Sequence, residues 1–153
     1  MKLFKTIFVF SIINFGALYI GNILMNDGPR TAWYQNLNQA PWTPPGWFFG
    51  VAWSTIMICF SVYMAYLYKT MPNSKVKILF AIQFILNVIW NYIFFNQHLV
   101  GVALICIILL SLVVGKFLFA YKDQLKTKSL LILPYFIWLI VATSLNAYVF
   151  IYN

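Results

Sequence analysis

The sequence predicts an all-α integral membrane protein, a bundle of five transmembrane helices. Of its 153 residues, 63% are hydrophobic and only 8% are charged, whereas about a quarter of the residues in a soluble domain carry charge. The mean hydropathy is +0.86. The apolar residues fall into five runs, each close to the roughly 20 residues that a helix needs to cross a bilayer.

The predicted spans are separated by short polar segments. We expect them to cover residues 3–25, 47–68, 76–95, 99–121 and 129–151. The third and fourth are separated by a tight turn at residues 96–98. Pro134 falls one turn inside the fifth span, where it should kink or thin the start of the helix. Because so few residues remain outside the spans, we expect residues 1–153 to form a single domain.

The first loop, residues 26–46, is the longest connection and is named the lid loop here. It reads NDGPRTAWYQNLNQAPWTPPG. Pro41, Pro44 and Pro45 fix φ and exclude a continuous helix. Trp42 and Trp47 suit an aromatic belt at the membrane interface just as well. A belt does not require a proline-stiffened loop of this length, so we expect a lid over a cavity.

The positive charges are distributed unevenly between the two sides of the predicted bundle. Alternate loops carry nine lysines on one side, and Arg30 alone lies on the other. Since cytoplasmic loops are enriched in Lys and Arg, we expect a cytoplasmic N-terminus, with the lid loop and C-terminus outside a bacterial-type plasma membrane. The basic residues form no stripe or aromatic-basic motif, which argues against nucleic acid as a partner.

Amides and tryptophans share faces of three predicted spans. Gln83, Asn87 and Trp90 lie on one face of the third, because residues four and seven apart align on a helix. The fifth span repeats this spacing with Trp138, Ala142, Leu145 and Asn146, and the second carries Gly50 and Trp53. Each amide could serve only to join helices. The added tryptophans favour an aromatic-walled pocket for a flat, largely apolar ligand.

Other polar residues give no sign of an ion pump or a metal site. No Asp, Glu, Lys or Arg lies in the centre of a span, although proton relays and ion pumps usually need one there. His98 stands alone in a turn, and Cys59 and Cys106 have no disulfide or metal spacing. Close helix contact is predicted at three pairs of small residues, namely Ala17–Gly21, Gly50–Ser54 and Ser111–Gly115.

Three sequence blocks resemble the translocator protein family, also known as TspO, the tryptophan-rich sensory proteins or the peripheral benzodiazepine receptors. The first runs from Trp33-Tyr34 through Pro41-Trp42-x-Pro44-Pro45-x-Trp47 to Gly50 and Trp53. The second is Gln83-x-x-Leu86-Asn87-x-x-Trp90, followed by Phe94-Phe95. The third is Pro134-Tyr135-x-x-Trp138-x-x-x-Ala142-Thr143-x-Leu145-Asn146. The blocks follow the order of the family and cover essentially the whole chain.

This resemblance implies a five-helix bundle, often dimeric, that binds protoporphyrin IX, haem-related tetrapyrroles or similar flat hydrophobic ligands under the lid loop. No cofactor is required, and the porphyrin is a ligand or a substrate. A C-terminal sterol motif described for animal members is incomplete here, since no basic residue follows Tyr148. The implied ligand-binding residues are Trp33, Tyr34, Pro41, Gly50, Trp53, Asn87, Trp90, Trp138, Ala142, Leu145 and Asn146.

Four functions stay open at this point. The first is binding of porphyrin for tetrapyrrole sensing, transport or regulation. The second is light- and oxygen-dependent degradation of porphyrin, in which Trp53 and Trp138 would act as the catalytic residues. The third is passage of a small hydrophobic solute, and the fourth is a purely structural role. The pocket predicted beneath the lid loop favours the first.

Overall fold

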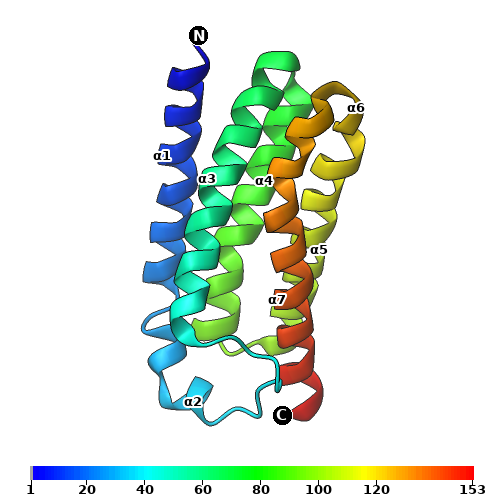
Figure 1. The fold of residues 1–153 in the computed structure, drawn as a ribbon. Helices are drawn as coiled ribbons and strands as arrows, with labels where there is room; N and C mark the ends of the chain where they lie inside the picture. Colours follow the sequence, from blue (N-terminus) through cyan, green and yellow to red (C-terminus); the bar gives the residue numbers. More distant parts are fainter. Residues whose placement is uncertain (1) are drawn as a thin grey trace.

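The computed structural model describes residues 2–153 and contains five helices long and apolar enough to cross a membrane. The predicted fold class, a bundle of five transmembrane helices, is confirmed. The N-terminus and C-terminus lie at opposite ends of the bundle, as an odd number of spans requires (Figure 1). The long helices are α1 (Leu3–Leu24), α3 (Gly46–Thr70), α4 (Ser74–Asn91), α5 (Val100–Ala120) and α7 (Leu133–Tyr152).

Short helical segments connect the long helices. The 3₁₀ turn η1 (Gly28–Arg30) and the one-turn helix α2 (Ala32–Gln35) form the first part of the lid loop. The π-helical segment η2 (Tyr92–Asn96) extends α4. Helix α6 (Lys122–Leu125) and the 3₁₀ segment η3 (Lys126–Ile132) precede α7. The π segment widens the end of α4 beside the lid loop, and such segments are frequent at functional sites.

The start of the last long helix differs from the sequence prediction. A span was expected from residue 129, with Pro134 one turn inside it. In the structure residues 126–132 form η3, so α7 begins at Leu133 and Pro134 lies in its first turn. Proline is tolerated there because the first amides of a helix have no partner within the helix, so its missing N–H costs no hydrogen bond. The start of the span is thus the tighter 3₁₀ form, which agrees with the expected thinning, and the α-helix begins at Leu133 instead of residue 129.

Each long helix packs against particular neighbours around the bundle. Helix α1 packs on α3 and α4, α5 packs on α4 and α7, and α7 returns to α3 through a sparser contact. The centre of the bundle is aromatic and fully buried at Phe60, Tyr63, Phe117 and Tyr135. The Tyr63 hydroxyl donates to the Phe117 carbonyl oxygen at 2.6 Å. The core thus uses large rings, and the hydroxyl groups of its two tyrosines each have a hydrogen-bond partner on another helix.

A buried polar contact joins α1 to α3. Asn14 is only 1% exposed, and its Nδ2 donates to Ser61 Oγ at 2.9 Å. Ser61 Oγ donates in turn to the Met57 carbonyl oxygen at 2.6 Å. In the bilayer such a bond contributes about 0.6 kcal/mol on average. Asn14 therefore joins α1 to α3, which is the structural role expected of an amide that serves only to join helices.

Two of the three predicted small-residue pairs lie at helix contacts. A Cβ atom on Gly21 would lie 2.6 Å from Asn91 Nδ2, and one on Gly115 would lie 3.3 Å from Phe136 Cε2. The Gly50–Ser54 prediction is wrong within the chain, because Gly50 is exposed and a Cβ there would meet nothing within 4 Å. A side chain at position 21 would therefore have to displace the Asn91 amide at the α1–α4 contact.

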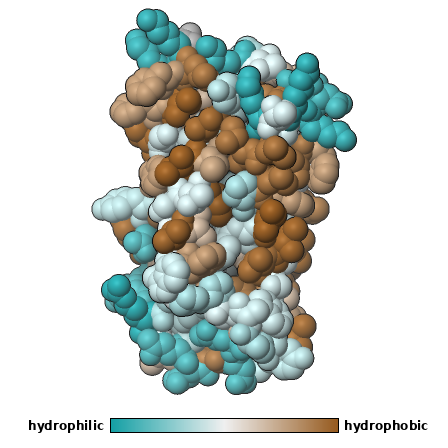
Figure 2. Space-filling view, in the orientation of Figure 1, coloured by the Kyte–Doolittle hydropathy of each residue, from teal (hydrophilic) through white to brown (hydrophobic). Residues whose placement is uncertain are grey.

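The surface of the bundle divides into a hydrophobic flank and two hydrophilic ends (Figure 2). The nine lysines belong to the start of α1, the α3–α4 connection and the region around α6. Two of them lie over tyrosine rings, with Lys128 Nζ 4.3 Å from the centre of Tyr66 and Lys77 Nζ 5.7 Å from that of Tyr68. This distribution fits an integral multi-pass membrane protein whose flank faces lipid tails.

We predict that Gly21→Val destabilises the protein by about 1–3 kcal/mol, because the new side chain overpacks the α1–α4 contact. Unfolding in mixed detergent micelles measures the loss. Gly16→Val is the matched control, since it makes the same change in the same helix where nothing lies within 4 Å. Equal stabilities of the two variants would contradict the close approach of α1 and α4.

Candidate functional site

The first part of the lid loop is held against the ends of α4 and α5 by aromatic contacts. The rings of Trp33 and His98 stack with centroids 3.9 Å apart and planes 9° from parallel. Trp33 also meets Phe94 at 5.7 Å, and Tyr34 meets Phe95 at 5.3 Å. His98 was expected to be a free loop residue. It is exposed, but its ring packs against Trp33 and so helps to hold the lid loop.

A side-chain cap sets the direction of this segment. Thr31 Oγ1 accepts from the Tyr34 backbone N–H at 3.3 Å and donates to the Gly28 carbonyl oxygen at 2.8 Å. Capping by Thr is typical of a helix start. The short helix α2 therefore begins at a fixed point and presents Trp33 and Tyr34 toward the bundle.

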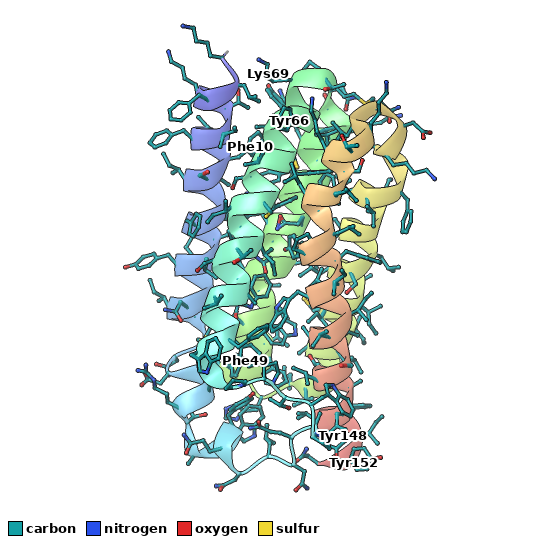
Figure 3. The ribbon with its side chains drawn as sticks, in the orientation of Figure 1. Phe10, Phe49, Tyr66, Lys69, Tyr148 and Tyr152 are labelled. Carbon is teal, nitrogen blue, oxygen red and sulfur yellow. The ribbon has the colours of Figure 1, made fainter. Side chains whose placement is uncertain are left out.

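The second part of the lid loop is bonded to the end of α7. Trp42 Nε1 donates to Ser144 Oγ at 3.0 Å, and its ring packs edge-on against Tyr148 at 5.6 Å. The Asn38 backbone N–H donates to Asn153 Oδ1 at 2.8 Å, and Asn153 Nδ2 donates to the Asn38 carbonyl oxygen at 3.0 Å. Figure 3 labels Tyr148 where α7 meets the loop. The lid loop thus contacts η2, the turn before α5, and α7.

The two belt candidates in the lid loop have different roles. Trp47 is 70% exposed, which suits an aromatic residue at the membrane interface. Trp42 is also exposed, but its indole N–H is used to fasten the loop to α7. Pro41 is exposed and lies away from the cavity described next. The sequence pattern alone could not separate these roles, because both tryptophans flank the same prolines.

A cavity of about 50 Å³ lies beneath the lid loop, between the ends of α3, α4 and α7. Its walls are mostly aromatic and aliphatic, with four side chains that carry an amide or a hydroxyl group. The lining residues are Tyr34, Gln39, Thr43, Phe49, Trp90, Phe94, Phe95, Ala142, Leu145, Asn146 and Val149. None of these is Asp, Glu, Lys, Arg or His. Burial raises the pKa of Tyr34 above its ordinary value, so its hydroxyl stays neutral at physiological pH.

Asn146 is the polar centre of the cavity wall. It is 2% exposed. Its Oδ1 accepts from Trp90 Nε1 at 3.0 Å, and its Nδ2 donates to the Val100 carbonyl oxygen at 3.1 Å. One amide on α7 thereby fixes a tryptophan on α4 and the first turn of α5. This arrangement holds the Trp90 ring rigidly, with one face stacked on Phe94 at 5.1 Å.

Trp53 and Trp138 form a second aromatic group next to the cavity. Their ring centroids are 6.5 Å apart, and Trp53 also packs on Tyr135 at 6.0 Å. Phe49 lines the cavity and touches Trp138 at 5.4 Å, and Figure 3 shows it near the start of α3. Phe49 therefore separates the Trp53–Trp138 pair from the cavity.

Two buried polar atoms among the described residues have no hydrogen-bond partner, Trp138 Nε1 and Gln83 Oε1. Gln83 Nε2 donates to the Tyr135 hydroxyl at 3.2 Å. An unpaired buried donor is costly and calls for an explanation. Trp138 Nε1 is thus an unpaired donor next to Phe49, which lines the cavity.

The structure brings together part of the predicted ligand-binding set. Tyr34, Trp90, Ala142, Leu145 and Asn146 line the cavity. Asn87 is buried on the same helix as Trp90, but it is outside the lining, and its carbonyl oxygen accepts from Asn91 Nδ2. Trp33 holds the lid loop in place. Gly50 and Pro41 are exposed on the surface and do not line the cavity.

Several lining residues were not predicted from the sequence. Phe49 lies one turn before Trp53 in α3, so the same helix-face argument could have found it. Val149 lies one turn after Leu145 and could have been found in the same way. Gln39 and Thr43 carry no such periodic signal, since they lie in an irregular part of the lid loop.

These features define a class of membrane protein, a five-helix bundle with an aromatic cavity under a proline-rich loop. The profile of the TspO/MBR family matches residues 8–152. Protein CrtK of Rhodobacter capsulatus is 37% identical over 121 residues, covering 75% of this chain and 74% of that protein.

Two further relatives widen the comparison. The tryptophan-rich protein TspO of Archaeoglobus fulgidus is 32% identical, with 79% of this chain and 80% of that protein covered. The translocator protein of Homo sapiens is 28% identical, with 78% and 73% covered. The chain belongs to the TspO/MBR family, as the three sequence blocks predicted.

We predict that a double-mutant cycle of Trp90→Phe and Asn146→Ala gives a coupling energy of about 0.6 kcal/mol, the average for hydrogen bonds between membrane helices. Thermal unfolding in detergent provides the four stabilities. The pair Trp90→Phe and Asn14→Ala is the control and should be additive, because the residues share no contact. Additivity of Trp90 and Asn146 would rule out their hydrogen bond.

Proposed function

We propose that the protein binds flat, largely hydrophobic ligands of the porphyrin class, such as protoporphyrin IX and haem-related tetrapyrroles, in the cavity under the lid loop. This binding would serve tetrapyrrole sensing, transport or regulation. The observation that carries the proposal is the fixed Trp90–Asn146 wall, where an indole held by a buried amide presents a rigid aromatic surface. Aromatic walls with few polar groups suit such a ligand.

The size of the cavity implies that the ligand must open it. Pockets for small molecules usually enclose about 300–1,000 Å³, whereas this cavity encloses about 50 Å³. The parts free to move are the lid loop, whose contacts with α7 are exposed hydrogen bonds, and the Phe49 side chain. Displacing Phe49 would extend the cavity to Trp138 and give its indole N–H an acceptor.

The polar groups of the lid loop suit the carboxylates of a porphyrin. Gln39 Nε2 donates to the Tyr34 carbonyl oxygen at 3.0 Å, and Thr43 Oγ1 donates to the Ala40 carbonyl oxygen at 2.7 Å. Both side chains line the cavity on the side of the lid loop. A carboxylate would form stronger, charge-assisted bonds with these donors. The apolar ring system would then lie deeper, against Trp90 and Leu145.

We predict that Ala142→Leu weakens protoporphyrin IX binding about tenfold, a loss of roughly 1.4 kcal/mol, because the larger side chain fills the cavity. Binding is measured by Trp quenching and by the porphyrin absorption shift in nanodiscs. Ala81→Leu is the matched control, since Ala81 is exposed and does not line the cavity. No saturable binding to the unmodified protein would overturn the proposal itself.

The second candidate is light- and oxygen-dependent degradation of the bound porphyrin. The observation in its favour is the contact between Trp53 and Trp138, beside the cavity and separated from it by Phe49. Molecular oxygen would be the oxidant. The test is a discrete new pigment formed in light and absent in the dark. If that pigment formed equally in Trp53→Phe and Trp138→Phe, these residues would have no role in the chemistry.

The orientation in a bacterial plasma membrane follows from the lysines and is also a proposal. In a variant with Cys59→Ser and Cys106→Ser, we predict that a membrane-impermeant maleimide labels Asn36→Cys in intact cells and leaves Thr127→Cys unlabelled. Both positions are exposed, so accessibility reports the side of the membrane alone. Labelling in the opposite sense would invert the topology. The homodimer stays a prediction.

A further inference from the structure

A groove of about 520 Å³ runs between the start of α5 and the end of α7, outside the cavity. Its walls are mainly apolar, and Leu99, Val102 and Phe150 are 50%, 50% and 55% exposed. His98 and Asn153 are polar residues of its lining, and Trp33 of the lid loop also lines it. Because α5 and α7 are lipid-crossing helices, the groove is continuous with the lipid-facing surface.

Only a thin partition separates this groove from the cavity. Val149 lines both spaces and is 5% exposed. Asn146 lines the cavity and donates to the carbonyl oxygen of Val100, which lines the groove. In the lid loop, Trp33 borders the groove and its neighbour Tyr34 borders the cavity. The two spaces therefore share a wall one side chain thick.

Opening the partition would break fewer interactions than opening the lid loop. One side-chain hydrogen bond, Asn146 to Val100, spans it, and Val149 is a small side chain. Opening the lid loop would break the Trp42–Ser144 bond, the paired Asn38–Asn153 bonds and the Trp33–His98 stack. A tetrapyrrole that dissolves in the bilayer reaches the groove directly, without first leaving the lipid.

We infer that the groove is a lateral vestibule, a second site in which the same flat amphipathic ligand lies before it passes Val149 into the cavity. This inference rests on the proposed function. The apolar walls at Val102 and Phe150 face the ring system, while the polar residues of the lining face its carboxylates. Passage through a shared wall changes association and dissociation rates together, and leaves the equilibrium affinity of the cavity unchanged.

The test is stopped-flow binding and release of protoporphyrin IX, followed by porphyrin absorbance, with each variant in nanodiscs. Val102→Trp fills the groove from its lipid side and does not line the cavity. Both rate constants should fall about tenfold while Kd stays within about threefold, since a barrier acts on kinetics alone. Ile105→Trp is the matched control, because Ile105 is one turn along α5, 61% exposed and outside the groove.

Two more variants distinguish the routes. Val149→Ala should raise both rates, because it thins the partition. Trp42→Phe removes the hydrogen bond from the lid loop to Ser144 on α7 and should leave both rates unchanged. Normal rates in Val102→Trp, or faster rates in Trp42→Phe alone, would overturn the vestibule and leave cavity binding intact. A loss of affinity without slower association in Val102→Trp would also overturn it. Absence of saturable binding in the unmodified protein would overturn the proposed function as well.

Discussion

The need to satisfy polar groups inside a bilayer governs this structure. Lipid tails offer no hydrogen bonds, so each buried amide must find a partner on another helix or be left unsatisfied at a cost. Asn146 meets this need with two bonds, to Trp90 and to the Val100 carbonyl oxygen. The same bonds orient the indole, anchor the first turn of α5 and close the wall between cavity and groove. Removing this one amide would affect all three features.

The lid loop follows a different rule, because it lies at the hydrophilic end of the bundle where water competes for its hydrogen bonds. Its first part is held by stacking of Trp33 on His98, and its second part is held by exposed hydrogen bonds to Ser144 and Asn153. Stacked rings resist sliding but separate at modest cost. The cavity thus has an inner wall held by one buried amide and a cover held by several contacts that water can reach.

Much of the fold could be predicted from the sequence because the signals were local. Apolar runs of the right length gave the five spans, and helix periodicity placed Trp90, Ala142, Leu145 and Asn146 on inward faces. The start of the last α-helix was placed at residue 129 instead of Leu133, because hydropathy does not distinguish an apolar 3₁₀ segment from an α-helix. Gly50 was misplaced because spacing shows that small residues share a face but not which way that face points.

The site was harder to predict than the fold, since it depends on which side chains meet across helices. Trp90 lines the cavity, whereas Trp53 and Trp138 contact each other beyond Phe49. Nothing in the sequence marks Phe49 as a divider, because it resembles any other apolar residue of its span. The bonds from Trp42 to Ser144 and from Asn38 to Asn153 link positions more than a hundred residues apart.

The small volume of the cavity, which a ligand must enlarge, has a consequence for selectivity. A pocket that takes its shape from the bound ligand imposes few steric limits. Its fixed features are an aromatic surface and the hydrogen bond between Trp90 and Asn146. Such a site discriminates by flatness and by the placement of one or two polar atoms, and only weakly by outline. Chemically unrelated planar molecules of different size would then compete for one place, and promiscuity would be a property built into the architecture.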